Sequence, residues 1–556
     1  MTNSIEQKRR ARESRGAIEK LYITMRHLFI RGNYKPFGVS GQGLMKTLLT
    51  LNPEIYGTMS DPGRVEIDGL LYVLDRLPRG IERCRHIRLI AREGFEESGY
   101  EVVVPLKRRR SCYRIDNESM YIEVTRGRSD IYDILTHLTF LFNEAQKIMQ
   151  NGLDPKGNIG SDWKKLEKLI HAEDEADLRV GITYLSNILG RTFAETKDAV
   201  ERFSQRKGEP SLFEIIYWMG QLTMNEYQDQ EYREITFSAK LREIIGHHVY
   251  GEMWAHRIKE FIDVKNWGHR PLHIVSANLH SFMNALYGYQ AGIKEPNLEQ
   301  LALQTSKPEN KELRDQIKEF ALAHGMHEVK DISGTNIGVQ FFELDKLEKI
   351  GKAPWLDFNE ETLAEKPLIM VMDYAFGEQA YECMDELFKP LKKGDERFPL
   401  NVESVSVMGK AGILKGGKGD IMIPTAHVFE GTGDNYPFQN EFKCKDFENQ
   451  NIGVYKGAMI TVLGTSLQNR DVLIHFVNTS WDAVGLEMEG AHYQKAIQAS
   501  ALIRRNINPQ VKVRYAYYAS DNPLETGATL ASGSLGNDGV KPTYLITQRI
   551  LEQILA

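Results

Sequence analysis

A series of short apolar runs in the second half of the chain most limits the folds open to it. Several of these runs, all after residue 267, are apolar at consecutive positions instead of alternate ones, which is typical of strands covered on both faces. The runs are RPLHIVSA, IGVQFFEL, PLIMVMDY, VESVSVMG, GDIMIP, GAMITVL, AVGLEME and VRYAYYAS. The first run leads directly into a helix-like stretch, LHSFMNALYGYQAG. We therefore expect an α/β domain with a mixed or largely parallel sheet.

The first half of the chain has a different pattern. Apolar residues at near-helical spacing predict a charged amphipathic helix from about Ser4 to Arg31. Between Val65 and Arg126 the runs LLYVL, HIRLIA, EVVVPL and SMYIEV predict a small antiparallel sheet, and long periodic segments from Asp130 to Val264 predict helices. We expect a mostly helical α+β domain over residues 1–266 and the α/β domain over residues 267–556.

Length and charge narrow the function classes. A chain of 556 residues exceeds the roughly 250 to 300 residues of one ordinary core, which agrees with two domains. With 70 Lys and Arg against 76 Asp and Glu, the net charge of -6 gives no general attraction to nucleic acid or anionic lipid. The run KRRR at Lys107 to Arg110 could hold a phosphate or nucleic acid, but a solvated hairpin is the commoner role. Small-molecule chemistry is therefore favoured over a nucleic-acid partner.

The cysteines and the hydropathy predict a protein of the cytoplasm. Cys84, Cys112, Cys383 and Cys444 stand singly, without the spacing of a zinc site or a disulfide framework. The first residues are charged where a signal peptide is apolar, and no segment approaches the roughly 18 apolar residues of a membrane span. We expect no membrane partner, no metal and no cofactor.

Small residues follow one of the apolar runs. Gly409, Ala411 and Gly412 come directly after VESVSVM, so we expect a glycine-rich turn at the carboxyl end of a strand. Small residues there let a ligand approach the backbone closely. A tight turn with no ligand is the commoner explanation for such a loop alone.

Two acidic segments follow later strands. Glu487, Met488 and Glu489 end the run AVGLEME. Ser520 ends the run VRYAYYAS, and Asp521 follows it directly. Carboxylates at strand ends point into the crevice where α/β sheets bind ligands. One carboxylate can accept hydrogen bonds from sugar hydroxyls, and a second, protonated carboxyl can donate a proton to a leaving base. The alternatives are a helix N-terminal charge for Glu489 and an N-cap or turn residue for Asp521.

Together these segments resemble the purine nucleoside phosphorylase and nucleosidase superfamily, and within it they are similar to the AMP nucleosidases, over residues 269–556. The resemblance implies a three-layer fold with a mixed sheet. It implies that Met488 lies against the nucleoside, that Glu489 holds the ribose hydroxyls and that Asp521 protonates the purine. The run HVFEGTGDNYPF, which contains Thr432, is similar to a Gly-Thr loop of AMP nucleosidases, and the Ser-Asp motif continues similarly through Gly527 and Leu530.

The match is weaker upstream. Ala375 to Ala380, with Gly377, occupies the place of a GxG loop that approaches phosphate or ribose, but the first glycine is missing. Ser276 to His280 occupies the place of the first strand and its loop. His280 is a candidate for contact with phosphate or water, with a structural histidine as the alternative.

The resemblance implies hydrolysis of the N-glycosidic bond of a purine nucleotide or nucleoside, with AMP giving adenine and ribose 5-phosphate. Glu489 and Asp521 are the predicted catalytic pair. The predicted substrate contacts are Met488, Glu487, Gly409, Ala411, Gly412, Ser520, Gly377, His280 and Thr432. The alternatives are phosphorolysis, with phosphate as the nucleophile, and a non-catalytic nucleotide sensor. The resemblance also implies a homo-oligomer, and a regulatory or oligomerisation role remains for the first domain.

Overall fold

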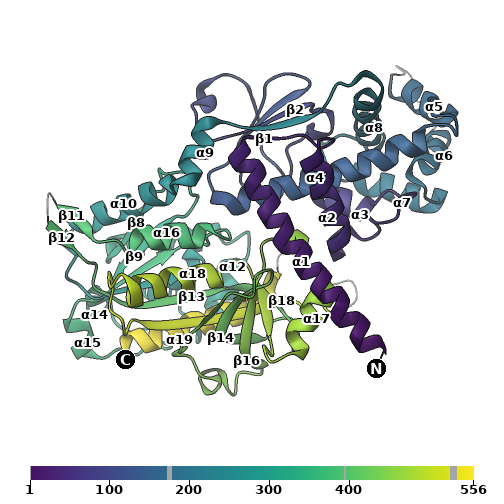
Figure 1. The fold of residues 1–556 in the computed structure, drawn as a ribbon. Coiled ribbons are helices and arrows are strands. Elements are labelled where there is room, and N and C mark those ends of the chain that lie inside the picture. The colour runs from purple at the N-terminus through teal and green to yellow at the C-terminus, as the bar shows by residue number, and fades with distance from the viewer. Residues whose placement is uncertain (1, 172–177, 394–395, 526–534) are drawn as a thin grey trace. The chain divides into compact units, whose positions relative to one another are not determined.

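The chain folds into two compact units. The computed structural model describes residues 2–171, 178–393, 396–525 and 535–556 (Figure 1). The first unit comprises Met1–Thr125, Asp130–His247 and Ser466–Asp471, and the second comprises Arg126–Ser129, His248–Thr465 and Val472–Ala556. The expected division into domains 1–266 and 267–556 remains a prediction about independent folding.

The first unit combines helices with a mixed sheet. Its strands follow the order β1-β6-β2-β5-β4-β3, and β2 runs parallel to both β5 and β6. The expected antiparallel arrangement is therefore wrong for the centre of this sheet and right for β3, β4 and β5. The elements are α1 (Thr2–Arg31), β1 (Asn33–Tyr34), α2 (Val39–Leu51), α3 (Ile67–Leu74), β2 (His86–Ile90), β3 (Glu101–Val103), β4 (Cys112–Arg114), β5 (Ser119–Glu123), α4 (Gly127–Gly152), α5 (Ser161–Ile170), α6 (Leu178–Leu189), α7 (Phe193–Ser204), α8 (Leu212–Asp229), β6 (Glu234–Phe237) and α9 (Ala239–Gly246).

One predicted strand of this unit is a helix. The run LLYVL lies in α3, where the Glu66 side chain accepts hydrogen bonds from the backbone NH groups of Asp68 and Gly69. This N-cap satisfies amides that a helix start would otherwise leave unpaired. An apolar run of five residues fits a buried helix as well as a strand, so the cap decides between them.

Two arginines of the basic run between β3 and β4, Arg108 and Arg110, form ion pairs with α4. Arg108 donates two hydrogen bonds of 2.9 Å to Asp133. The Arg110 side chain is 1% exposed, and its Nη2 lies 2.7 Å from Asp130 Oδ1 and 2.6 Å from Asp133 Oδ2. The expected solvated hairpin is therefore wrong for these two arginines, because they hold the loop to the start of α4.

The second unit contains a ten-stranded mixed sheet. Its order is β15-β14-β16-β17-β13-β7-β10-β9-β8, and β18 pairs with both β13 and β14. The elements are α10 (Val249–Val264), β7 (Leu272–Ser276), α11 (Leu279–Tyr287), α12 (Leu298–Ser306), α13 (Lys311–Ala323), β8 (Met326–Val329), β9 (Val339–Glu343), α14 (Leu347–Ile350), α15 (Glu360–Ala364), β10 (Leu368–Met372), α16 (Gln379–Leu387), β11 (Leu391–Lys393), β12 (Glu396–Phe398), β13 (Val402–Ile413), β14 (Ile421–Phe429), β15 (Asn435–Pro437), β16 (Val454–Thr461), α17 (Arg470–Asn478), β17 (Gly485–Glu487), α18 (Gly490–Gln498), β18 (Lys512–Asp521) and α19 (Val540–Leu555).

Part of this sheet closes on itself. Strand β13 pairs with β18, β18 with β14, β14 with β16, β16 with β17, and β17 again with β13. These five strands form a closed ring, and β13 also pairs with β7 in the open part of the sheet. The sequence predicted the strands but not the closure, because closure depends on pairing between distant segments.

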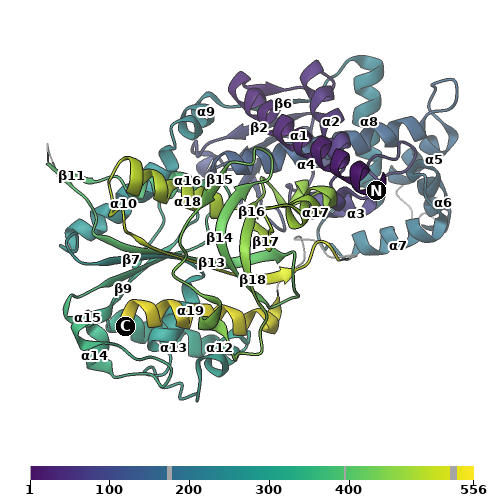
Figure 2. The same cartoon turned by 60° about the horizontal axis from the view of Figure 1, so that its bottom comes forward.

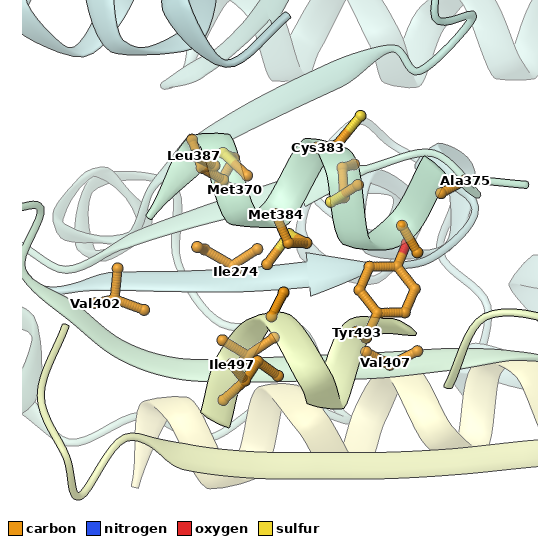
Figure 3. Packing of buried hydrophobic residues seen from close by; sticks show 14 of the residues in the cluster. Ile274, Met370, Ala375, Cys383, Met384, Leu387, Val402, Val407, Tyr493 and Ile497 are labelled. Carbon is orange, nitrogen blue, oxygen red and sulfur yellow. The ribbon is translucent and has the colours of Figure 1, made fainter. Parts of the chain in front are cut away.

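Helices cover both faces of the sheet. Helices α10, α16 and α18 lie on one face, and α11, α12, α13 and α19 lie on the other (Figure 2). In Figure 3, Met384 of α16 and Ile497 of α18 pack with Ile274 of β7 in the first of these two cores. The predicted three-layer α/β fold with a mixed sheet is confirmed. None of the described helices is both long and apolar enough to cross a membrane.

Candidate functional site

The site forms where β13 ends between two neighbouring strands. Gly409, Ala411 and Gly412 lie within β13, so the expected glycine-rich turn at these residues is wrong. Gly412 pairs with Leu486 of β17 on one side and with Asp521 of β18 on the other. The strand continues because both of its sides have partners.

This pairing brings the two acidic segments to the same end of β13. Strands in a sheet lie about 4.8 Å apart, so the strands on either side of β13 are roughly 10 Å apart. The Met-Glu segment follows Leu486, and Asp521 is the last residue of β18. The Met-Glu segment and Asp521 therefore lie on either side of one strand end.

Glu489 lies at the start of α18, but its side chain does not cap that helix. Its Oε1 accepts a hydrogen bond of 2.9 Å from the backbone NH of Gly377. Burial raises the pKa of Glu489 to about 7, although the Gly377 NH and the charge of Arg126 lower it. The carboxyl can therefore change its charge near neutral pH.

The acidic side chain that accepts hydrogen bonds at the N-terminus of α18 is Glu487, and not Glu489 as the alternative interpretation expected. Its Oε2 accepts hydrogen bonds from the backbone NH groups of Glu489, at 2.5 Å, and Gly490. Its Oε1 accepts a hydrogen bond of 2.5 Å from the Thr461 hydroxyl. Burial and the charge of Glu489 raise the pKa of Glu487 to about 8. Because these donors occupy most of its acceptor positions, Glu487 is better suited to position the Met-Glu segment than to contact a ligand.

Thr461 was not identified from the sequence. It ends β16, and its Oγ1 accepts a hydrogen bond of 3.0 Å from the Ala491 NH while donating to Glu487. The hydroxyl thus links the end of one strand to the first turn of α18. A threonine at the end of an apolar run carries no local signal of this role.

We expect the substitution Thr461→Val to lower the free energy of unfolding by about 1 to 3 kcal/mol, the usual cost of leaving buried hydrogen-bonding groups unpaired. Valine keeps the shape of threonine but removes both hydrogen bonds. Urea unfolding followed by circular dichroism measures the change. Thr461→Ser keeps the hydroxyl and serves as the control, and equal stability of the valine variant and the wild type would contradict the linking role.

Glycine is required directly after Glu489. A Cβ at Gly490 would lie 2.2 Å from Cδ2 of the buried His427 and 2.8 Å from Glu487 Oε1. His427 Nε2 in turn lies 3.2 Å from the Tyr517 hydroxyl. The glycine therefore lets α18 start against these side chains, which the sequence did not indicate.

Asp521 ends β18 and is 8% exposed. The Ser520 hydroxyl lies within hydrogen-bond distance of Asp521 Oδ1 and 3.1 Å from the Ala411 carbonyl oxygen. The turn after the strand is held by Asn522, whose Oδ1 accepts a hydrogen bond of 3.0 Å from the Leu524 NH. The turn role suggested for Asp521 thus belongs to Asn522. The continuation of the motif at Gly527 and Leu530 lies outside the described residues.

Gly377 lies beside both Met488 and Glu489. Its φ of +55° lies in the region that favours glycine. A Cβ there would lie 2.4 Å from Ser129 Oγ, so Ser129 leaves no room for a side chain at this position. The same Cβ would be 4.0 Å from Met488 Cε, an ordinary contact distance. Ser129 Oγ also accepts a hydrogen bond of 2.9 Å from the Glu378 NH.

His280 and Thr432 lie on exposed parts of the second unit. His280 is in the first turn of α11 and lines a cavity of about 330 Å³ with Asn278, Asn284 and Tyr544. Thr432 lies in the loop between β14 and β15, where its hydroxyl accepts a hydrogen bond of 3.3 Å from the Asp434 NH. Ligand contacts by either residue remain predictions.

The fold and these residues define a three-layer α/β unit with an acidic segment on each side of one strand end. The chain belongs to a family of unknown function, DUF6909, whose model matches residues 42–304 and 298–556. A comparison with curated proteins finds no match.

Solved structures of nucleosidases and phosphorylases show similarity to about half of the chain. The 5′-methylthioadenosine/S-adenosyl homocysteine nucleosidase of Campylobacter jejuni is 11% identical, with 51% of this chain and 97% of that chain covered and a TM-score of 0.30. Uridine phosphorylase from Schistosoma mansoni in complex with thymidine is 11% identical, with 54% and 92% covered and a TM-score of 0.32. Futalosine hydrolase of Helicobacter pylori is 12% identical, with 51% and 97% covered and a TM-score of 0.30. At these scores the similarity assigns no function.

Proposed function

We propose that the second unit hydrolyses the N-glycosidic bond of a purine nucleotide or nucleoside, with AMP as the first candidate. The observation that carries this proposal is the pairing of Gly412 with both Leu486 and Asp521. It sets the Met-Glu segment and Asp521 on opposite sides of one strand end, the arrangement needed to act on both halves of a ribosyl-purine.

The chemistry requires charge to be stabilised on two groups. As the bond between the anomeric carbon and the purine nitrogen breaks, the ribose becomes cationic and the base takes the bonding electrons. Ionised Glu489 accepts hydrogen bonds from the ribose hydroxyls and supports the positive charge. Asp521 donates a proton to the purine, and Met488 provides an apolar wall. Water forms the new bond to the anomeric carbon and releases a proton, and uptake of one proton restores the Asp521 carboxyl.

Incubation of the purified protein with AMP, adenosine and other purine nucleotides, with and without inorganic phosphate, tests the proposal. We expect chromatography to detect adenine and ribose 5-phosphate from AMP without added phosphate. Strict dependence on phosphate would instead identify a phosphorylase. Binding without turnover, unchanged by Asp521→Asn, would identify a sensor, and release of no base from any of these compounds excludes both enzymatic functions.

A further inference from the structure

A short segment at the start of α4 belongs to the second unit. It contacts the loop between β10 and α16 that contains Gly377, called the Gly377 loop below. The segment is Arg126–Ser129, and Ser129 Oγ accepts a hydrogen bond of 2.9 Å from the Glu378 NH. Gly377 has no side chain at the point where Ser129 approaches. These contacts set the position of Arg126 relative to the loop.

The Arg126 guanidinium lies against an aromatic ring of the same loop. Its Cζ is 4.4 Å from the centroid of the Phe376 ring, within the range of a cation–π interaction. Phe376 directly precedes Gly377, whose NH donates to Glu489. The positive charge of Arg126 is close enough to lower the pKa of Glu489, against the larger effect of burial. Arg126 is half-buried and therefore acts on the space around Glu489 with little screening.

The neighbouring Arg128 has a different use. Its Nη1 lies 3.1 Å from Glu378 Oε1, so a carboxylate of the same loop balances its charge. The charge of Arg126 acts on Glu489 and lowers its pKa. Glu487 lies beside Glu489, because its Oε2 accepts a hydrogen bond of 2.5 Å from the Glu489 NH. These acidic groups would repel an anionic substrate unless a cation were present.

The chemistry of the proposed substrate indicates what such a cation would bind. Adenine and ribose are neutral, so the phosphate is the anionic part of a nucleotide. A guanidinium matches phosphate oxygens with two parallel hydrogen bonds. We propose that Arg126 binds a phosphate group beside Glu489, which makes a nucleotide the preferred substrate over a nucleoside. This inference rests on the proposed function, and the same chemistry could hold a free inorganic phosphate.

Calorimetric titration with AMP, adenosine and inorganic phosphate tests the proposal in the wild type and in Arg126→Gln and Arg126→Lys. We expect Arg126→Gln to weaken AMP binding by roughly 10- to 100-fold, the effect of losing charged hydrogen bonds. Adenosine binding should change little. The AMP affinity of Arg126→Lys should lie between that of the wild type and that of Arg126→Gln. Arg257→Gln, at an exposed arginine of α10, is the matched control, and circular dichroism reports whether each variant is folded.

The outcomes separate this proposal from the proposed function. If folded Arg126→Gln binds AMP and inorganic phosphate as tightly as the wild type does, the phosphate site is overturned. Loss of inorganic phosphate binding with unchanged AMP binding supports the site and assigns it to free phosphate. If no purine is released from any compound but AMP binding still depends on Arg126, the hydrolase proposal fails and the phosphate site remains.

Discussion

Replacement of Asp521 by asparagine is expected to lower kcat for AMP by about 100- to 10,000-fold, the contribution usual for a general acid. Asparagine has nearly the same shape and can still hydrogen-bond, but it has no acidic proton to give to the departing purine. The residue ends β18 and is held by pairing with Gly412, so the backbone should not move. AMP affinity should therefore change much less than kcat.

Single-turnover measurements of adenine release, combined with AMP binding, separate these two effects. Asp482→Asn is the matched control, because Asp482 is an exposed aspartate in the loop before β17. A wild-type kcat in folded Asp521→Asn would show that another group protonates the base, or that the base leaves without protonation.

Replacement of Glu489 by glutamine is expected to lower kcat/KM by about 100- to 1,000-fold, because the neutral amide cannot support the cationic ribose. The pH dependence is a sharper test. The pKa of Glu489 is raised to about 7 by burial, so the ionised fraction falls as the pH drops below that value. Wild-type kcat/KM should therefore decrease about tenfold per pH unit on the acid side of pH 7.

The acid limb of the pH profile should disappear in Glu489→Gln, since the titrating group is gone. Glu299→Gln, at an exposed position of α12, should keep the wild-type profile. If the acid limb persists in Glu489→Gln, the titration belongs to another group, and Glu487, a buried carboxyl that accepts a hydrogen bond from the NH of residue 489, is the first candidate.

Much of the second unit could be predicted from the sequence, because continuous apolar runs identify strands covered on both faces. The end of β13 could not. Gly409 and Gly412 favour a turn locally, yet pairing with segments more than 70 residues away in sequence keeps the chain extended. The run LLYVL shows the same limit in the first unit, where the Glu66 cap and not the apolar pattern sets the helix.

Some residues of the candidate site could likewise be predicted from the sequence, and others could not. Met488, Glu489 and Asp521 stand in motifs with recognisable order, so the sequence could single them out. Thr461 and Arg126 stand in no such motif, because their contacts with α18 and with the Gly377 loop form only in the folded chain. The basic run was misleading for the opposite reason, since its charge is visible in the sequence but its partners in α4 are not.

The position of β13 in two parts of one sheet has a consequence for motion. Local opening exposes backbone amides most readily where one side of a strand is unpaired. Gly412 pairs with β17 on one side and with β18 on the other, within a ring of strands that has no free edge at that point. The backbone amides at this end of β13 should therefore exchange their hydrogens only when the whole sheet unfolds. Any movement that admits a substrate must then come from the segments attached to the ring.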